Sequence, residues 1–119
     1  MWLVRLVVVA GPKNDAGHKT FGKAGGAYVN CLIDFPERHG AMRLAKMYAT
    51  EPKAGVWRFR RFLFARRITR RQLKADKAYL RYFAEAERYG YSLAFHIYPK
   101  DARGGLGPTQ KAQAEKYGA

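Results

Sequence analysis

The chain has 119 residues, with 23 Lys and Arg against nine Asp and Glu, so its formal net charge at pH 7 is +14. A hydrophobic content of 48% with two Trp, eight Tyr and seven Phe excludes a disordered basic tail and indicates a folded domain. The single cysteine, Cys31, excludes an internal disulfide and a cysteine-rich zinc site, so we expect a reducing, cytoplasmic setting.

The first half of the chain predicts two strands and a helix. Residues 2–10 are rich in Val and Leu and stop at a Gly-Pro pair, which is typical of a strand. The stretch 11–26 has no apolar period and predicts a loop, whereas 27–33 predicts a second strand. A helix is expected to start with Asp34 as its N-cap and to end before Pro52.

The second half predicts a strand, a helix and another strand. Residues 56–68 alternate apolar and basic side chains and predict the third strand. The next helix is expected to begin at Thr69, which opens a capping box, and to end at Gly90. Residues 91–98 alternate cleanly and predict the fourth strand, and the Gly-rich tail at 100–119 favours a short helix near its end.

The element order β-β-α-β-α-β predicts an α+β fold. We expect one domain at 1–99, built as a four-stranded, mostly antiparallel or mixed sheet with both helices packed on one face. The tail at 100–119 would follow this domain. No stretch is long and apolar enough to span a membrane.

Alternation along the strands predicts which side chains share the sheet face away from the helices. That face is expected to carry Arg5, Tyr28, Asn30, Arg58, Arg60, His96 and Tyr98. The consecutive Arg60 and Arg61 break the alternation and indicate a β-bulge. Aromatic rings beside guanidinium groups are typical of surfaces that stack bases and pair with phosphates. The alternative is that a second copy of the chain or the tail covers this face.

Positive charge is concentrated between residues 53 and 77, which hold ten Lys and Arg against one acid, Asp76. The helix after this segment is expected to carry a cationic stripe made of Arg70, Lys74, Lys77, Arg81 and Arg88. The helix dipole disfavours cations at the N-terminus, so Arg70 and Arg71 are expected to meet an anion there.

Two carboxylates, Asp76 and Glu87, are expected inside the apolar arc of the same helix. A buried carboxylate needs a partner, and the strand arginines Arg61 and Arg67 are the expected partners in structural ion pairs. A catalytic carboxylate in a pocket is the alternative.

These patterns predict a small basic protein that binds nucleic acid, either RNA or DNA. The expected contact residues are Arg5, Tyr28, Arg58, Arg60, Arg70, Arg71, Lys74, Lys77, Arg81, His96 and Tyr98. No serine nucleophile motif and no metal-ligand spacing is present, so no catalytic residue, metal or cofactor is assigned.

Two other functions stay open on the sequence. One is a protein-interaction module whose open sheet face forms a homodimer, or whose arginines bind an acidic protein. The other is a small enzyme or anion-binding protein that uses His96, Asp76 and the 11–26 loop, with His96 in a pocket as the acid–base group.

Overall fold

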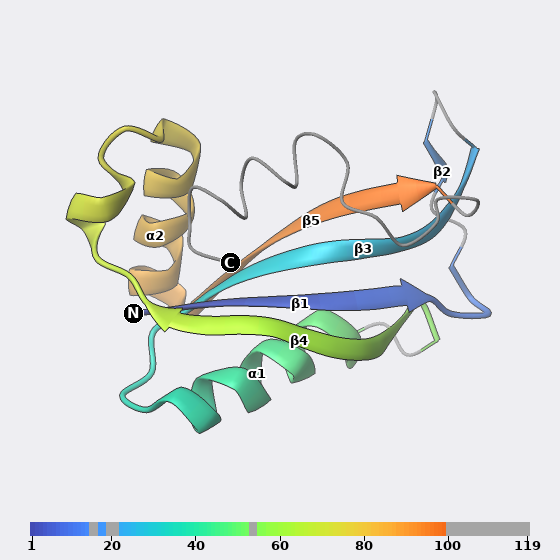
Figure 1. Cartoon of the computed structure of the whole chain (residues 1–119), viewed down its shortest axis with the longest axis horizontal. Coiled ribbons are helices and arrows are strands. Elements are labelled where there is room, and N and C mark those ends of the chain that lie inside the picture. Colours follow the sequence, from blue (N-terminus) through green and yellow to red (C-terminus); the bar gives the residue numbers. More distant parts are fainter. Residues whose placement is uncertain (15–16, 19–21, 53–54, 100–119) are drawn as a thin grey trace.

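The computed structural model describes residues 1–14, 17–18, 22–52 and 55–99, and the predicted tail at 100–119 lies outside these ranges. The described chain runs through β1 (Trp2–Ala10), β2 (Gly17–His18), β3 (Gly22–Ile33), α1 (Arg38–Thr50), β4 (Trp57–Arg67), the 3-10 helix η1 (Arg70–Leu73), α2 (Lys77–Tyr89) and β5 (Tyr91–Pro99) (Figure 1). None of the helices in these ranges is long and apolar enough to cross a membrane.

Four strands form one open antiparallel sheet in the order β4-β1-β3-β5, and the short β2 pairs with the start of β3. The α+β class, the four-stranded sheet, the two helices and their order along the chain are thereby confirmed. The main departure lies in β3, which already begins at Gly22. The second half of the predicted 11–26 loop therefore includes strand residues.

β4 lies at one edge of the sheet and pairs with β1 through two bulges. Val7 pairs with Arg61 and Val8 with Phe59, which leaves Arg60 as an extra residue. This confirms the bulge predicted from the consecutive arginines. A second register shift between Arg5 and Leu6 leaves Leu63 as another extra residue, and the sequence did not indicate it.

The two helices pack on opposite faces of the sheet. Neighbouring residues of a strand point to opposite sides, and each helix packs on a different set of them. Around α1, the buried core comprises Val4, Leu6, Val8, Ala27, Val29, Cys31, Ile33, Ala41, Ala45, Ala49 and Ala65. Around α2, it comprises Leu3, Leu32, Ile68, Leu73, Tyr79, Phe83 and Ala86. The arrangement expected from the sequence, with both helices on one face, is corrected for α2.

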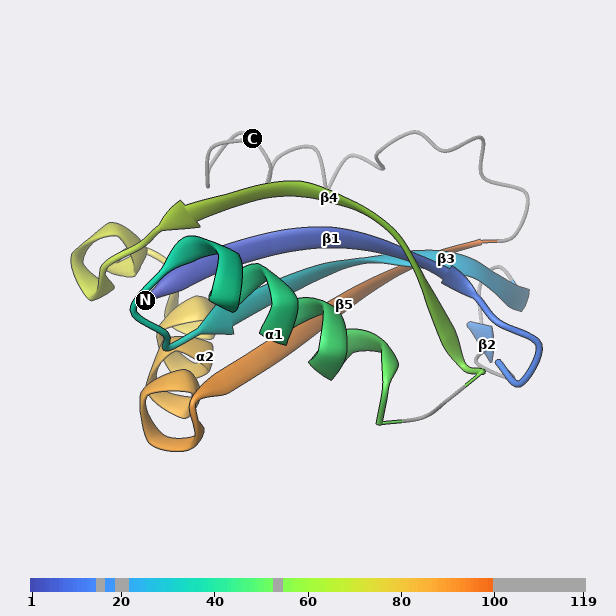
Figure 2. The ribbon, with the colours of Figure 1, turned by 90° about the horizontal axis from the view of Figure 1, so that it is seen from below.

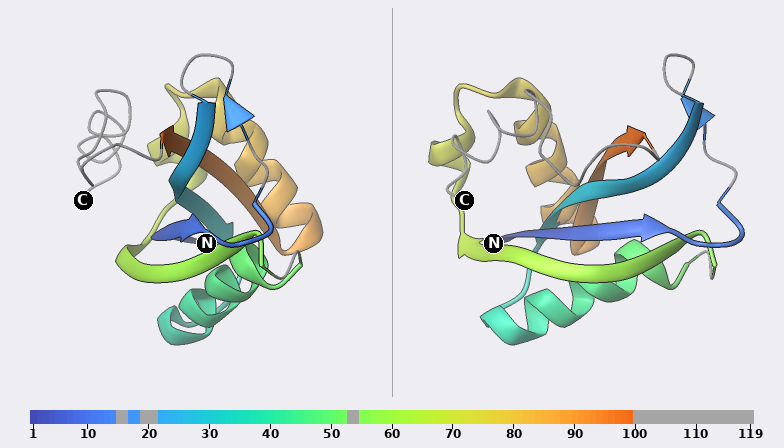
Figure 3. Two further views of the ribbon diagram at one scale, coloured as in Figure 1. Left: turned by 90° about the vertical axis from the view of Figure 1, so that its right-hand side faces the viewer. Right: turned by 45° about the vertical axis from the view of Figure 1, so that its right-hand side comes forward.

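The pictures agree with this division of the core. Seen from below, α1 lies across the sheet, in front of the strands (Figure 2). The sheet is strongly twisted, and α2 stands at the end where β4 finishes and β5 begins, apart from α1 (Figure 3).

Local capping explains where each helix begins and ends. Glu37, and not Asp34, is the N-cap of α1, because its carboxylate accepts hydrogen bonds from the backbone N–H groups of His39 and Gly40. Asp76 is the N-cap of α2, so the helix expected from Thr69 is divided into η1 and α2. Gly90 ends α2 with φ of 91°, which confirms the predicted C-terminal glycine.

Candidate nucleic-acid interface

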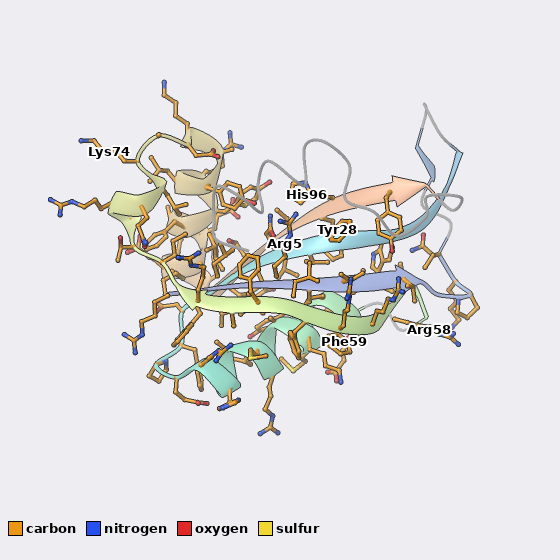
Figure 4. The ribbon with its side chains drawn as sticks, in the orientation of Figure 1. Arg5, Tyr28, Arg58, Phe59, Lys74 and His96 are labelled. Carbon is orange, nitrogen blue, oxygen red and sulfur yellow. The ribbon has the colours of Figure 1, made fainter. Side chains whose placement is uncertain are left out.

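A run of exposed cations follows β4 into η1, and we call it the basic edge. It consists of Arg58, Arg60, Arg61, Arg66, Arg67, Arg70, Arg71 and Lys74. Arg58 and Lys74 lie near opposite ends of the molecule (Figure 4). The positive charge is therefore spread along an edge rather than gathered into one patch.

The sheet itself supplies no negative charge beside these arginines. β1, β3, β4 and β5 contain no Asp or Glu, whereas five of the eleven residues of β4 are arginine. A stretch of one charge sign raises the local concentration of ions of the opposite sign. The basic edge is thus suited to an extended polyanion.

The bulges of β4 decide where its arginines point. Arg58 pairs with Val9 and Arg61 with Val7, so both lie on the face that also carries Arg5. Arg60 sits in the bulge between Phe59 and Arg61 and is exposed. Arg58 and Arg61 therefore lie on one face of the sheet, whereas Arg60 lies in the bulge.

Arg67 lies on the other face of the sheet. It pairs with Trp2, and its guanidinium carbon lies 5.2 Å from the centre of the Trp2 ring. This contact orients Arg67 beside an aromatic plane without neutralising its charge.

A polar cluster lies on the sheet face that α2 partly covers. The Asn30 side-chain amide donates a hydrogen bond to the Tyr79 hydroxyl, and its Nδ2 lies 3.3 Å from His96 Nε2. With its nitrogen facing the ring, the amide can donate to His96 Nε2 when that nitrogen carries no proton. Burial lowers the pKa of His96, and the nearby Arg5 lowers it further. Burial also raises the pKa of Tyr79 to about 12.

Arg5 and Tyr28 lie on the predicted face but are not available to a nucleic acid. Arg5 is 1% exposed and Tyr28 is 4% exposed. The Arg5 guanidinium carbon lies 5.5 Å from the centre of the Tyr28 ring, and the Tyr28 and Tyr98 rings are 5.4 Å apart. Arg5 and Tyr28 are therefore left out of the interface, because both side chains are buried within the chain.

The remaining predicted contact residues are accessible to different degrees. His96 and Tyr98 are half-buried, and Tyr98 lies over Gly26, where a side chain would meet its ring. On α2, Lys77 and Arg81 are exposed, as the predicted cationic stripe requires. Whether any of these residues contacts a nucleic acid stays a prediction.

The acidic residues of this region have partners other than those expected. Glu87 forms an ion pair with Arg70 rather than with Arg61 or Arg67, and both members are exposed. The Asp76 carboxylate accepts a hydrogen bond from the Tyr79 backbone N–H at 3.2 Å, as an N-cap does. The expectation failed because it placed both acids on one continuous helix, whereas Asp76 precedes α2.

Sequence reasoning missed two features of this region. Tyr79 lies in the buried core around α2, yet its hydroxyl joins the polar cluster. A buried tyrosine hydroxyl needs a hydrogen-bond partner, which is the signal that could have found it. The second feature is a surface hollow of about 410 Å³ lined by Arg70, Arg71, Lys74 and Leu80.

Within the described ranges, no three His, Cys, Asp or Glu side chains lie close enough together to hold a metal ion. Comparison with known proteins found no family model, no curated sequence and no solved structure that matches the chain.

Proposed function

We propose that the protein binds nucleic acid through the phosphate backbone, along the basic edge. The observation that carries this proposal is the set of five exposed arginines on an edge strand of a sheet that contains no acidic residue. Guanidinium groups pair with phosphate oxygens through two parallel hydrogen bonds, and they remain charged at any physiological pH.

Such binding would depend little on base sequence. Phosphate contacts position a protein on a nucleic acid but carry no sequence information. Of the two tyrosines expected to stack bases, Tyr28 is buried and Tyr98 is half-buried. We therefore expect the basic edge to bind unrelated sequences with similar affinity.

The first test is the salt dependence of binding, measured by titrating the protein into a labelled single-stranded 20-mer and its duplex. If about six phosphates are neutralised, the plot of log affinity against log salt has a slope of roughly −4 for the single strand and roughly −5 for the duplex. Binding that is micromolar or weaker and insensitive to salt contradicts the proposal.

A pair of variants with equal charge locates the interface. The first, Arg60→Gln with Arg61→Gln, removes two cations from the basic edge. The control, Arg38→Gln with Arg43→Gln, removes two exposed cations from α1, on the other side of the sheet from α2. Each variant lowers the formal net charge from +14 to +12.

For the single strand, the edge variant should make the slope of log affinity against log salt shallower by about 1.4, because two phosphate contacts are lost. The control should change this slope by less than half of that amount. Charged side chains and bulges also protect an edge strand against pairing with other chains. If the edge variant aggregates but binds with an unchanged slope, the arginines of β4 serve that protective role and the proposal is wrong.

A further inference from the structure

We propose that the hollow at η1 binds the terminal phosphate of a nucleic-acid strand laid along the basic edge. This inference rests on the proposed function and adds a preferred chemical group and a defined end to the interface. Among the described residues that line the hollow, three are cations, Arg70, Arg71 and Lys74, and the fourth is the apolar Leu80.

The hollow is held in shape by the turn that carries it. The Thr69 backbone N–H donates to Gln72 Oε1 at 2.7 Å, and the Gln72 backbone N–H donates to Thr69 Oγ1 at 3.4 Å. Leu73 is 0% exposed and anchors η1 in the core beside Phe83. The cations on either side of Leu73 therefore extend from a fixed backbone, so little ordering is needed when an anion binds.

The charge of the hollow suits a terminal phosphate better than an internal one. A phosphate monoester carries about −1.5 to −2 at neutral pH, whereas a phosphodiester inside a strand carries −1. Arg70 already shares its charge with Glu87, to which it is ion-paired. Arg71 and Lys74 then supply two further positive charges, which match a doubly charged group.

The position of the hollow also suits the end of a strand. It lies directly after β4 in the chain, where the arginines of the strand give way to η1. Lys74 marks this end of the molecule, and Arg58 marks the other (Figure 4). A strand that follows β4 from Arg58 would reach the hollow with its last phosphate.

The test compares three versions of one internally labelled 12-mer that carry a 5′-phosphate, a 3′-phosphate or hydroxyl groups at both ends. We expect one of the phosphorylated versions to bind at least about 5-fold more tightly than the hydroxyl-ended version, since hydrogen bonds between charged groups are the stronger ones. Arg71→Gln with Lys74→Gln should abolish this preference and keep most of the affinity for the hydroxyl-ended strand.

The matched control is Lys77→Gln with Arg81→Gln, which removes two exposed cations of α2 that do not line the hollow. It should keep the preference. Equal affinity of wild-type protein for all three strands, or a preference that survives in the Arg71/Lys74 variant, overturns the inference and leaves the proposed function standing. If none of the three strands binds, the proposed function fails and the inference fails with it.

Discussion

His96 is half-buried beside Asn30, and both burial and the charge of Arg5 disfavour its protonated form. The pKa of His96 is therefore lower in the folded protein than in the unfolded chain, where it lies near 6.5. Between these two values the unfolded chain binds more protons than the folded protein. Stability contributed by neutral His96 is therefore present above about pH 6.5. It is lost as the pH falls from there through the lower pKa of His96 in the folded protein.

We expect the free energy of unfolding, measured by urea denaturation, to fall between about pH 7 and pH 5, with a slope of at most about 1.4 kcal/mol per pH unit from this one group. His96→Gln should remove this component. The comparison variant is His39→Gln, which removes an exposed histidine of α1 instead. Identical profiles for wild type and His96→Gln would show that His96 titrates alike in both states.

Glu87 bears directly on the proposed phosphate site, because its carboxylate already pairs with Arg70. Glu87→Gln removes a negative charge and an internal competitor for that arginine. Exposed ion pairs are worth about 0–1 kcal/mol, so we expect the affinity for a phosphate-terminated 12-mer to rise by up to about 5-fold.

Glu85→Gln removes the same charge from another exposed position of α2 and serves as the control. It should raise affinity for the phosphorylated and hydroxyl-ended strands to the same small extent. An equal gain from both substitutions would show that Glu87 acts through net charge and not through Arg70.

At the scale of elements, the segment after β4 is where the predicted helix and the structure differ most. The sequence correctly indicated a capping box at Thr69 and a helix end at Gly90. It did not reveal that a second cap, Asp76, starts α2 separately. A capping signal marks a helix start without setting how long that helix is, because length depends on where the next turn packs.

Thr69→Ala tests how far this turn depends on its cap. Loss of an N-cap hydroxyl usually costs about 1 kcal/mol, so the free energy of unfolding should fall by about that amount. The preference for a terminal phosphate should weaken as well, since the turn carries the cations of the hollow.

Thr50→Ala is the matched control, because the Thr50 hydroxyl donates to the Lys46 carbonyl at the end of α1. Alanine has the higher helix propensity, so this change should leave stability within about 0.5 kcal/mol or raise it. A Thr69 variant as stable as this control would show that the capping box contributes little.

At the scale of the whole molecule, the two helices pack on opposite faces of the sheet, which the sequence did not indicate. β3 and β4 both run antiparallel to β1, so they are parallel to each other, and the α1 connection between them falls under the right-handed rule for crossovers. β4 and β5 are antiparallel, and that rule does not govern the connection through α2. No local signal therefore fixed the face on which α2 lies.

The predicted contact surface was right in its faces and wrong in its exposure. Alternation correctly put Arg5, Tyr28 and His96 on one face, because a strand's side-chain period does not depend on its neighbours. The prediction that Arg5 and Tyr28 are exposed was wrong, because exposure depends on what packs above the strand. The homodimer through an open sheet face stays a prediction, although those two side chains are buried within one copy of the chain.

The sequence by itself determined the four long strands and the two α-helices, the bulge at Arg60 and the concentration of arginine on β4, since each follows from short-range patterns of side chains. Only the tertiary structure decided that β4 is an edge strand, that Arg5 is buried, and that Arg70, Arg71 and Lys74 line one hollow. These features depend on which distant segments pack together, and packing is set by the free energy of the whole core rather than by any one segment.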